Sequence, residues 1–495
     1  MAAWATPVYI GAPLWRFLLH GVAGESAFKA LSGISLNLMT DRLGAFVATA
    51  FVSAWFRLPQ ATFLILAAAG RSRRAMDEAA ALDGAGPAAL AFSVRLPAMA
   101  GALAAVAAME LLSAFKEFTV PYLLTAGGPP LLMGVTERGV VGATTTLEIY
   151  LYDMFSSYAD RGVLAAYSVA LSTVMWVGAG LAFAMRRRAT ASRGAAGRSR
   201  PFLSSRPPAA RGVGYVPGRV ADLGFGAWSL SGALVLALSV AALAWCILWM
   251  AFSGLSVAFV DSFFPAYPSV EGFALSFGAD GVMRNFMNTA WVSAWAALIT
   301  VAVAFPAAAW LAERPASRTI MAFALLQALS SAGGVHSLIP LYELWRRTGL
   351  LGGYVPVVLI YVYHSAPTAL LALATFLRDQ PKSLRDAARL EGLGPTAWAA
   401  RILLPLALPA IGAAAMLAFL SAWNGFLAPL IFLDDDSKYT IAIRLHSYVG
   451  SIASGAPKWN RFAAVSIANV ALVGALFWRF KRPLSGSALA EHAED

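Results

Sequence analysis

The sequence predicts an all-α protein that crosses a membrane about nine or ten times. Of its 495 residues, 59% are hydrophobic and only 13% are charged, whereas a soluble globular protein carries about 25% charged residues. Apolar runs that could cross a bilayer, each of roughly 20 residues, recur along the whole chain. Lipid favours such helices because each satisfies its own backbone hydrogen bonds. This pattern argues against the alternative of a very apolar soluble enzyme.

The expected spans follow from these apolar runs. They lie near 44–70, 98–126, 161–185, 227–253, 288–312, 319–341, 353–377, 402–432 and 462–480, with a shorter one at 4–22. Basic clusters follow the first, third, fifth, seventh and last of the nine longer runs, and basic loops stay in the cytoplasm. With these clusters inside, the spans alternate and the C-terminus is cytoplasmic. Only Arg346 and Arg347 then lie on the outer side.

Composition also excludes several classes of function. The formal charge is +11, but the arginines gather in short loops, whereas a nucleic-acid-binding domain shows a basic face. The single cysteine, Cys246, excludes internal disulfides and thiolate metal sites. His336 and His364 have no metal-like partners in the sequence and are interpreted as packing or pore groups. No phosphate-binding loop of the G-x-x-x-x-G-K-[ST] type occurs. We therefore expect no ATP hydrolysis, catalytic residue, metal or cofactor in this chain.

The chain changes character between two apolar regions. Residues 189–225 are rich in Arg, Gly, Pro and Ser, a composition typical of flexible linkers. The sequence therefore predicts a first membrane half at 1–188, a cytoplasmic linker, a second half at 226–484 and a cytoplasmic tail at 485–495. An RNA-binding or lipid-surface role is the alternative for the linker.

A twenty-residue pattern occurs twice. EAAALDGAGPAALAFSVRLP at 78–97 and DAARLEGLGPTAWAARILLP at 386–405 share ten of twenty positions without a gap. Alanine-rich composition alone would not place their glycines and prolines in one register. Each copy follows a basic loop and enters an apolar run. An ordinary interfacial loop would need no second copy, so the repeat indicates two related halves.

The repeat predicts a short cytoplasmic helix, a bend and then a membrane helix. Its alanines favour helix and give it a thin surface that can pack closely against another body. Gly84 and Gly86 can end this helix. Pro97 and Pro405 suit the first turn of the helix that follows.

The doubled pattern resembles the EAA loop of ABC importer permeases. In that family the loop forms the coupling helix that docks in a cleft of an ATP-binding cassette subunit. The second copy departs from the family pattern at Asp386, where glutamate is usual, and at Leu393, where alanine is common. The resemblance implies two ATP-binding cassette subunits as partners, which bind the ATP. The residues that would carry this contact are Glu78, Ala79, Ala80, Asp83, Gly84, Asp386, Ala387, Ala388, Glu391 and Gly392.

Other stretches resemble the carbohydrate branch of these permeases, the maltose-type pair. PYLLTAGGP at 121–129 and TLEIYLYDMFSSYADRGVLAAYS at 146–168 are similar to one subunit of the pair. RNFMNTAWVSA at 284–294 and WNGFLAPLIFLDDDSKYTIAIRL at 423–445 are similar to the other, although Gly425 replaces its usual acidic residue. The resemblance implies two type I importer halves fused head to tail in a bacterial cytoplasmic (inner) membrane. It also implies an extracytoplasmic solute-binding protein as a partner.

The two predicted halves are unequal. The second has six runs, whereas the first has three clear runs plus the stretch at 4–22. By resemblance, the first half lacks the initial helices of a usual subunit. Either this half is degenerate or its reading frame begins further upstream.

Polar residues within spans are candidates for a solute path, because they are costly in lipid. Glu110, Lys116 and Glu117 lie in the run at 98–126. Carboxylate and ammonium groups bind hydroxyls, but a salt bridge at the helix end explains them equally well. Trp423 and Asn424 could stack on and hydrogen-bond a sugar, or lock helices together.

The sequence thus predicts a permease subunit of an ATP-driven importer that translocates carbohydrate. A fused permease for iron, polyamine or thiamine is the first alternative. A secondary transporter is the second, with Glu110 as its one buried acidic candidate. A non-transporting membrane scaffold is the third.

Overall fold

We describe the protein from a computed structural model. The structure describes residues 6–20, 29, 33, 37–38, 40–69, 80, 82, 84–86, 89–136, 139–157, 162–174, 177, 218–254, 264–265, 267–315, 318, 321–322, 325–326, 334–450 and 457–484. These residues form two compact units. Residues 53–116 and 218–244 belong to the first unit, and 6–52, 117–172 and 245–484 to the second. The second unit thus combines segments from both sides of the predicted linker.

Five helices of the described part are long and apolar enough to cross a membrane. Their apolar spans are Leu234–Ala251, Val282–Ala312, Tyr354–Arg378, Ala399–Trp423 and Trp459–Leu476. The corresponding helices are α11 (Gly218–Ala251), α13 (Val282–Ala312), α16 (Tyr354–Arg378), α19 (Leu404–Trp423) and α22 (Trp459–Leu484). Each coincides with a run predicted from the sequence. Most of 319–334 lies outside the described residues, as does the run at 161–185 beyond a helix at Gly162–Val174.

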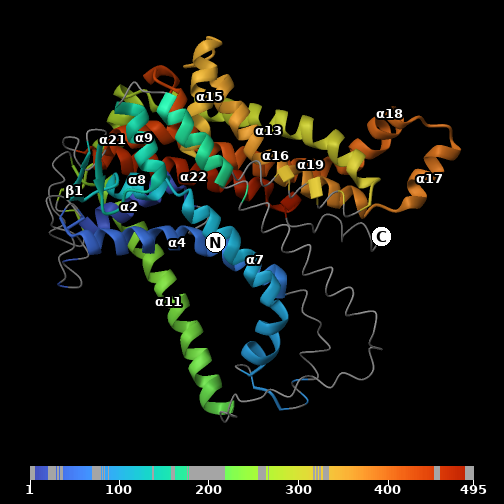
Figure 1. Ribbon diagram of the computed structural model, residues 1–495, viewed down its shortest axis with the longest axis horizontal. Coiled ribbons are helices and arrows are strands. Elements are labelled where there is room, and N and C mark those ends of the chain that lie inside the picture. Colours follow the sequence, from blue (N-terminus) through green and yellow to red (C-terminus); the bar gives the residue numbers. More distant parts are fainter. Residues whose placement is uncertain are drawn as a thin grey trace. The chain divides into compact units, whose positions relative to one another are not determined.

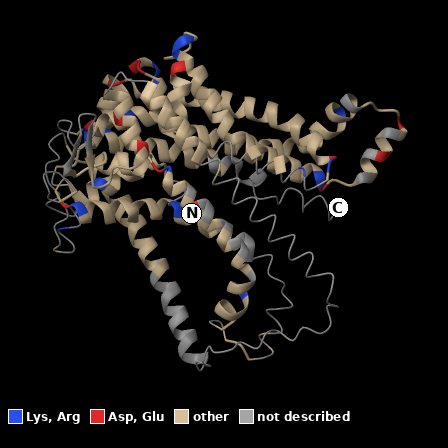
Figure 2. Ribbon diagram, viewed as in Figure 1, with Lys and Arg blue, Asp and Glu red and all other residues tan. Residues whose placement is uncertain are grey.

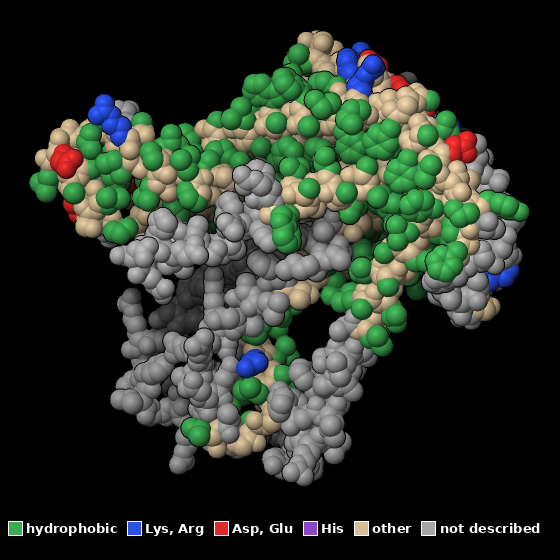
Figure 3. All heavy atoms as spheres, turned by 180° about the vertical axis from the view of Figure 1, so that it is seen from behind, with side chains coloured by type: hydrophobic (Ala, Val, Ile, Leu, Met, Phe, Trp, Pro, Cys, Tyr) green, Lys and Arg blue, Asp and Glu red, His purple; other side chains and the backbone are tan. Residues whose placement is uncertain are grey.

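Helices α13, α16 and α19 form the core of the second unit (Figure 1). Alanines and leucines fill it, among them Ala304, Leu373 and Ala407. Small residues let membrane helices approach closely. Large apolar side chains such as Trp291 and Trp310 point outward. Figure 3 shows hydrophobic side chains over much of the visible face, and Figure 2 shows charged residues mostly toward helix ends. This surface suits a lipid environment.

The two ends of this bundle carry different elements. At one end lie α17 (Lys382–Leu390) and α18 (Pro395–Trp398), and at the other lie α15 (Val335–Arg347) and α21 (Ile441–Val449) (Figure 1). Arg378 at the end of α16 donates hydrogen bonds of 3.0 Å to the carbonyls of Leu311 and Arg314 at the end of α13. Two loops predicted to be cytoplasmic therefore lie at the same end of the bundle.

Two predicted spans are broken helices rather than single ones. The run at 98–126 forms α7 (Leu96–Phe115) and α8 (Thr119–Thr125), and the run at 402–432 forms α19 and α20 (Leu427–Phe432). Pro121 and Pro429 lie in the first turn of each second segment. Proline lacks the amide hydrogen and clashes with the carbonyl four residues earlier, so a helix cannot continue through it unbroken.

The remaining helices include the long α4 (Arg42–Ala69), which the two units share. Shorter ones are α2 (Val8–His20), α9 (Leu147–Ser157) and α12 (Glu271–Ala274). Single π-helical turns occur at Leu90–Arg95 (η1), Leu275–Ala279 (η2) and Ala399–Leu403 (η3), and a 3-10 turn at Asp436–Lys438 (η4).

Two details correct the sequence-based expectations. An antiparallel hairpin, β1 (Pro130–Thr136) with β2 (Gly139–Gly142), interrupts the otherwise helical described part. Helix α11 begins at Gly218, inside the segment predicted as linker. Its apolar span is Leu234–Ala251, and the helix extends back from this span to Gly218. The rest of the linker, 189–217, and the predicted tail, 485–495, lie outside the described residues.

Candidate coupling loops and solute path

The second copy of the repeat forms an exposed helix with a left-handed end. Asp386 and Ala387 of α17 are exposed, whereas Ala388 is buried. After the helix, Gly392 has a φ of 74°, and Leu393 N donates a 3.0 Å hydrogen bond to the carbonyl of Ala388. This left-handed turn satisfies a carbonyl at the helix end and favours glycine.

The first copy ends in the same way where it is described. Gly84 has a φ of 80°, and Ala85 N donates a 3.0 Å bond to the carbonyl of Ala80. A side chain on Gly84 or Gly392 would meet nothing within 4 Å, so backbone conformation, not crowding, favours glycine. Glu78, Ala79 and Asp83 lie outside the described residues. Exposed Glu391 and Gly392 complete the predicted contact set, whose docking role stays a prediction.

The repeat extends beyond the twenty residues recognised in the sequence. After each loop, a π-helical turn leads into a helix of 20 residues, α7 or α19. Each helix then breaks before a residue with nearly identical backbone angles: Phe118 at φ −113°, ψ −48° and Phe426 at φ −117°, ψ −48°. Phe118-x-x-Pro121 and Phe426-x-x-Pro429 keep the register of the loops, so the sequence held this signal.

The predicted polar residues of the first half have local partners. Glu110 on α7 pairs with Arg57 on α4, with 3.5 Å between Oε2 and Nη1. Arg57 also donates to the carbonyl of Ser113 at 2.8 Å, so the pair helps to hold these helices together. Glu117 lies in the break and accepts a 3.3 Å hydrogen bond from Val120 N. Glu117 therefore caps the start of α8. Lys116 directly precedes Glu117 and ends α7.

The second-half break lies within a chain of buried hydrogen bonds. Trp423 Nε1 donates to Asn469 Oδ1 at 3.0 Å, and Asn469 Nδ2 donates to Tyr9 Oη at 3.3 Å. The Trp423 ring packs against Phe419 and Phe286, with centroids 5.5 and 6.5 Å away. In this conformation the Trp423 side chain therefore hydrogen-bonds to Asn469 and packs against two aromatic rings of the protein. Its predicted contact with solute remains a prediction.

A tyrosine that sequence reasoning missed lies against Gly425. The side chain of Tyr361, from α16, is only 6% exposed. A Cβ atom on Gly425 would overlap the Tyr361 ring and hydroxyl. Tyr361 thus fills the space next to the position where the resemblance leads one to expect an acidic side chain. Asn424 precedes this contact as the residue that ends α19.

A buried carboxylate–imidazole pair was also missed. Glu148 on α9 and His336 on α15 are 1% and 0% exposed, and Glu148 Oε1 lies 2.5 Å from His336 Nδ1. Glu148 Oε2 accepts from His336 N at 3.2 Å. A side chain on Gly334 would meet both groups. His336 is therefore a partner in a helix–helix contact, a role that its sequence position does not reveal, whereas His364 lies against Tyr363.

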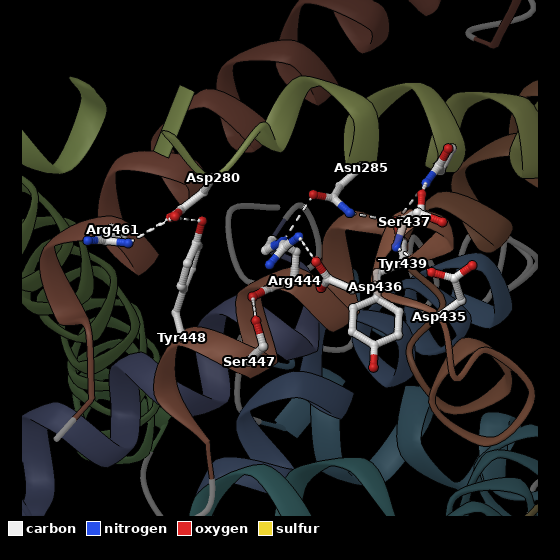
Figure 4. A network of polar contacts seen from close by, with 11 residues as sticks. Asp280, Asn285, Asp435, Asp436, Ser437, Tyr439, Arg444, Ser447, Tyr448 and Arg461 are labelled. Atoms are coloured by element: carbon white, nitrogen blue, oxygen red, sulfur yellow. Dashed lines mark hydrogen bonds and ion pairs between the residues drawn. The ribbon is translucent and has the colours of Figure 1, made fainter. Parts of the chain in front are cut away.

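A polar network joins the start of α13 to the segment before α21 (Figure 4). Arg444 donates to Asn285 Oδ1 at 3.1 Å and to Asp436 Oδ2 at 2.9 Å. Asn285 in turn donates to the carbonyl of Tyr439 at 2.9 Å. The nearby hydroxyl and amide of Ser437 hydrogen-bond to Asp435 and hold the pKa of that carboxyl below its usual range.

A second part of this network anchors α22. Arg461 donates to both oxygens of Asp280, at 2.9 and 3.0 Å, and Tyr448 Oη donates to Asp280 Oδ2 at 2.7 Å (Figure 4). Charge-assisted bonds of this kind are among the stronger hydrogen bonds in proteins. The network therefore fixes α21 against α13 and α22 at the end of the bundle opposite α17.

A buried arginine of α2 contacts the end of α21. Arg16 of α2 is 6% exposed and donates to the carbonyls of Gly450 at 2.9 Å and Val449 at 3.5 Å. These carbonyls end α21, where the helix dipole is negative. The guanidinium also lies 5.6 Å from the centre of the Trp459 ring. The charge is thus offset by a helix end and an aromatic face.

Arg346 and Arg347, the exception to the predicted arginine pattern, pair with a carboxylate at the tip of α15. Glu343 accepts hydrogen bonds from Arg346 at 2.7 and 2.9 Å and from Arg347 at 2.9 Å. These bonds lower the pKa of Glu343 to about 2. One carboxylate therefore offsets part of the positive charge of these two arginines, whose place on the outer side stays a prediction.

These features define a class: a polytopic helical membrane protein in which a glycine turn, a helix of 20 residues and a break occur twice with the same local geometry. Comparison with known families gives the particular family. The model of the binding-protein-dependent transport system inner membrane component matches residues 1–190 and 296–478. The chain belongs to this family, the ABC importer permeases, and carries two permease regions.

Bacterial relatives are similar to this chain over less than half of its length. The sulfoquinovosyl glycerol transport system permease protein SmoH of Agrobacterium fabrum is 26% identical over 216 residues, 44% of this chain and 76% of that protein. A putative ABC transporter permease protein of Streptomyces antibioticus is 29% identical over 206 residues, 42% of this chain and 89% of that protein. The alpha-glucoside transport system permease protein AglG of Rhizobium meliloti is 26% identical over 228 residues, 45% and 59% of the two chains.

Proposed function

We propose that this chain is a fused permease that carries both transmembrane halves of an ABC importer for carbohydrate. The loop–helix–break unit carries the proposal, because it occurs twice and each copy has a left-handed glycine in its loop, Gly84 or Gly392. Relatives named as permeases for sulfoquinovosyl glycerol and alpha-glucosides support carbohydrate as the solute. The maltose-type motifs of the sequence favour the same class.

In the proposed mechanism, each coupling helix docks on one of two ATP-binding cassette subunits. ATP-driven closure of these subunits draws the two loops together. Helix α17 is joined to α19 through the turn at Gly392, α18 and one π-helical turn. In this mechanism its movement passes along α19 to the break at Asn424. A solute-binding protein delivers the solute at the opposite end, where the network around Arg444 holds α21 in place.

The coupling step is tested by substitution of the left-handed glycines. We expect Gly392→Val to abolish copurification of the cognate ATPase subunit and uptake, because a β-branched residue is strained at a φ of 74°. Gly412→Val is the matched control. Gly412 is exposed in the middle of α19, lacks a positive φ, and has open space for a side chain.

Two outcomes would count against the proposal. If Gly392→Val and Gly84→Val both retained ATPase binding and uptake, the loops would not be the coupling helices. If vesicles with the wild-type chain accumulated solute from an ion gradient without ATP, the chain would be a secondary transporter. Uptake of iron, polyamine or thiamine instead of sugar would leave the permease proposal in place and change the solute.

A further inference from the structure

Two buried oxygen atoms at the second-half break have no hydrogen-bond partner among the described residues: Tyr361 Oη and Asn424 Oδ1. By contrast, Trp423, Asn469 and Tyr9 form a continuous chain of hydrogen bonds beside them. A buried hydroxyl without a partner destabilises a protein relative to the same ring without the hydroxyl. The presence of tyrosine at this position is therefore best explained by another state of the protein, in which its hydroxyl forms a hydrogen bond.

The two atoms belong to residues that meet at the same turn of backbone. The Tyr361 hydroxyl reaches the backbone of Gly425, where a Cβ atom would collide with it. Asn424 is the next residue along the chain and ends α19. Glycine at position 425 thus admits the phenol from α16 to the break. In the first half, the same two positions are Lys116 and Glu117, and Glu117 caps α8. The first-half break therefore carries charged side chains. The second-half break is neutral and has two oxygens without a hydrogen-bond partner among the described residues.

We propose that Tyr361 Oη and Asn424 Oδ1 form a neutral subsite that hydrogen-bonds a hydroxyl group of the solute when the helices around the break separate. This inference rests on the proposed carbohydrate importer. A phenol can donate and accept, and an amide oxygen accepts, so together they match a sugar hydroxyl. Neither group carries the charge that would favour a metal ion or a polyamine. In the conformation described here, both oxygens are shut off from solvent.

The test uses the complete transporter in proteoliposomes, with its ATPase subunits and binding protein. The probes are radiolabelled trehalose, maltose, melibiose and raffinose, followed by monodeoxy analogues of the sugar transported fastest. Tyr361→Phe removes only the hydroxyl. Tyr363→Phe is the matched control, because Tyr363 lies on the same helix and is 45% exposed. We expect Tyr361→Phe to lower uptake roughly 3- to 10-fold, the effect of losing one neutral hydrogen bond.

Two further readouts separate binding of solute from support of the fold. Tyr361→Phe should unfold at the same temperature as the wild type or higher, since no protein hydrogen bond is lost. One monodeoxy analogue should be transported equally by wild type and Tyr361→Phe, because it lacks the hydroxyl that meets the tyrosine. The wild type and Asn424→Ala should likewise transport that analogue at equal rates.

The possible results have distinct meanings. If sugars are transported and Tyr361→Phe behaves like Tyr363→Phe, the subsite is wrong and the importer stands. If Tyr361→Phe lowers uptake of every deoxy analogue equally and lowers the unfolding temperature, Tyr361 supports the fold and the subsite is again wrong. If the wild type transports no sugar of the panel while it hydrolyses ATP, the carbohydrate function fails and the subsite fails with it.

Discussion

At the scale of single residues, the second-half break shows how one glycine changes the chemistry of its surroundings. Gly425 has no side chain, so the ring of Tyr361 can lie against its backbone. The sequence revealed the missing acidic residue but not what replaced it. Tyr361 precedes Gly425 by more than sixty residues on another helix, and no local pattern links the two. Such a pair becomes visible only when the helices are packed.

We expect Gly425→Ala to destabilise the protein by about 1 to 3 kcal/mol, the usual cost of overpacking a core. Its added methyl group must displace the Tyr361 ring. In a Tyr361→Ala background the same substitution should cost much less, because the obstructing ring is gone. Unfolding by SDS in mixed micelles would measure all four proteins of this cycle. Equal costs of Gly425→Ala in both backgrounds would contradict the packing described here.

At the scale of elements, apolar runs predicted most membrane helices but not their interruptions. Hydropathy predicted the runs at 98–126 and 402–432 as continuous helices, because it contains no information on backbone hydrogen bonds. The prolines at 121 and 429 break both helices in the same way, and they were visible in the sequence. The hairpin of β1 and β2 was missed for another reason. Its strands are short apolar runs, and a short apolar run does not distinguish strand from helix.

The Glu148–His336 contact is an element-scale feature, because it joins α9 to the start of α15. We expect Glu148→Ala to destabilise the protein by about 3 to 5 kcal/mol, the cost of removing one partner of a buried pair. The His336 imidazole would stay buried but lose the carboxylate that hydrogen-bonds to it. Glu343→Ala on α15 is the control, since Glu343 pairs with arginines at the exposed tip. Its SDS unfolding midpoint should hardly change, and a similar loss in both variants would contradict a special role for the buried pair.

At the scale of the whole molecule, the sequence predicted two halves joined by a linker, and the family model matches two regions. The packing cuts across this division. In the second compact unit, Tyr9 and Arg16 from the first half bond to Asn469 and to the end of α21. Glu148, also from the first half, bonds to His336 of the second. Linear motifs could not predict these contacts, because each involves single residues more than 180 positions apart.

These contacts predict how a divided chain would behave. Two polypeptides, 1–200 and 201–495, should copurify from membranes when expressed together, because the peptide link between them carries none of the contacts just described. Residues 201–495 alone should accumulate poorly, since Asn469, His336 and the carbonyls at the end of α21 lose their partners. Affinity purification through a tag on one polypeptide, with quantitative blotting of both, measures this. If 201–495 alone accumulated and unfolded like the whole chain, and no complex formed with 1–200, the two halves would not share a core.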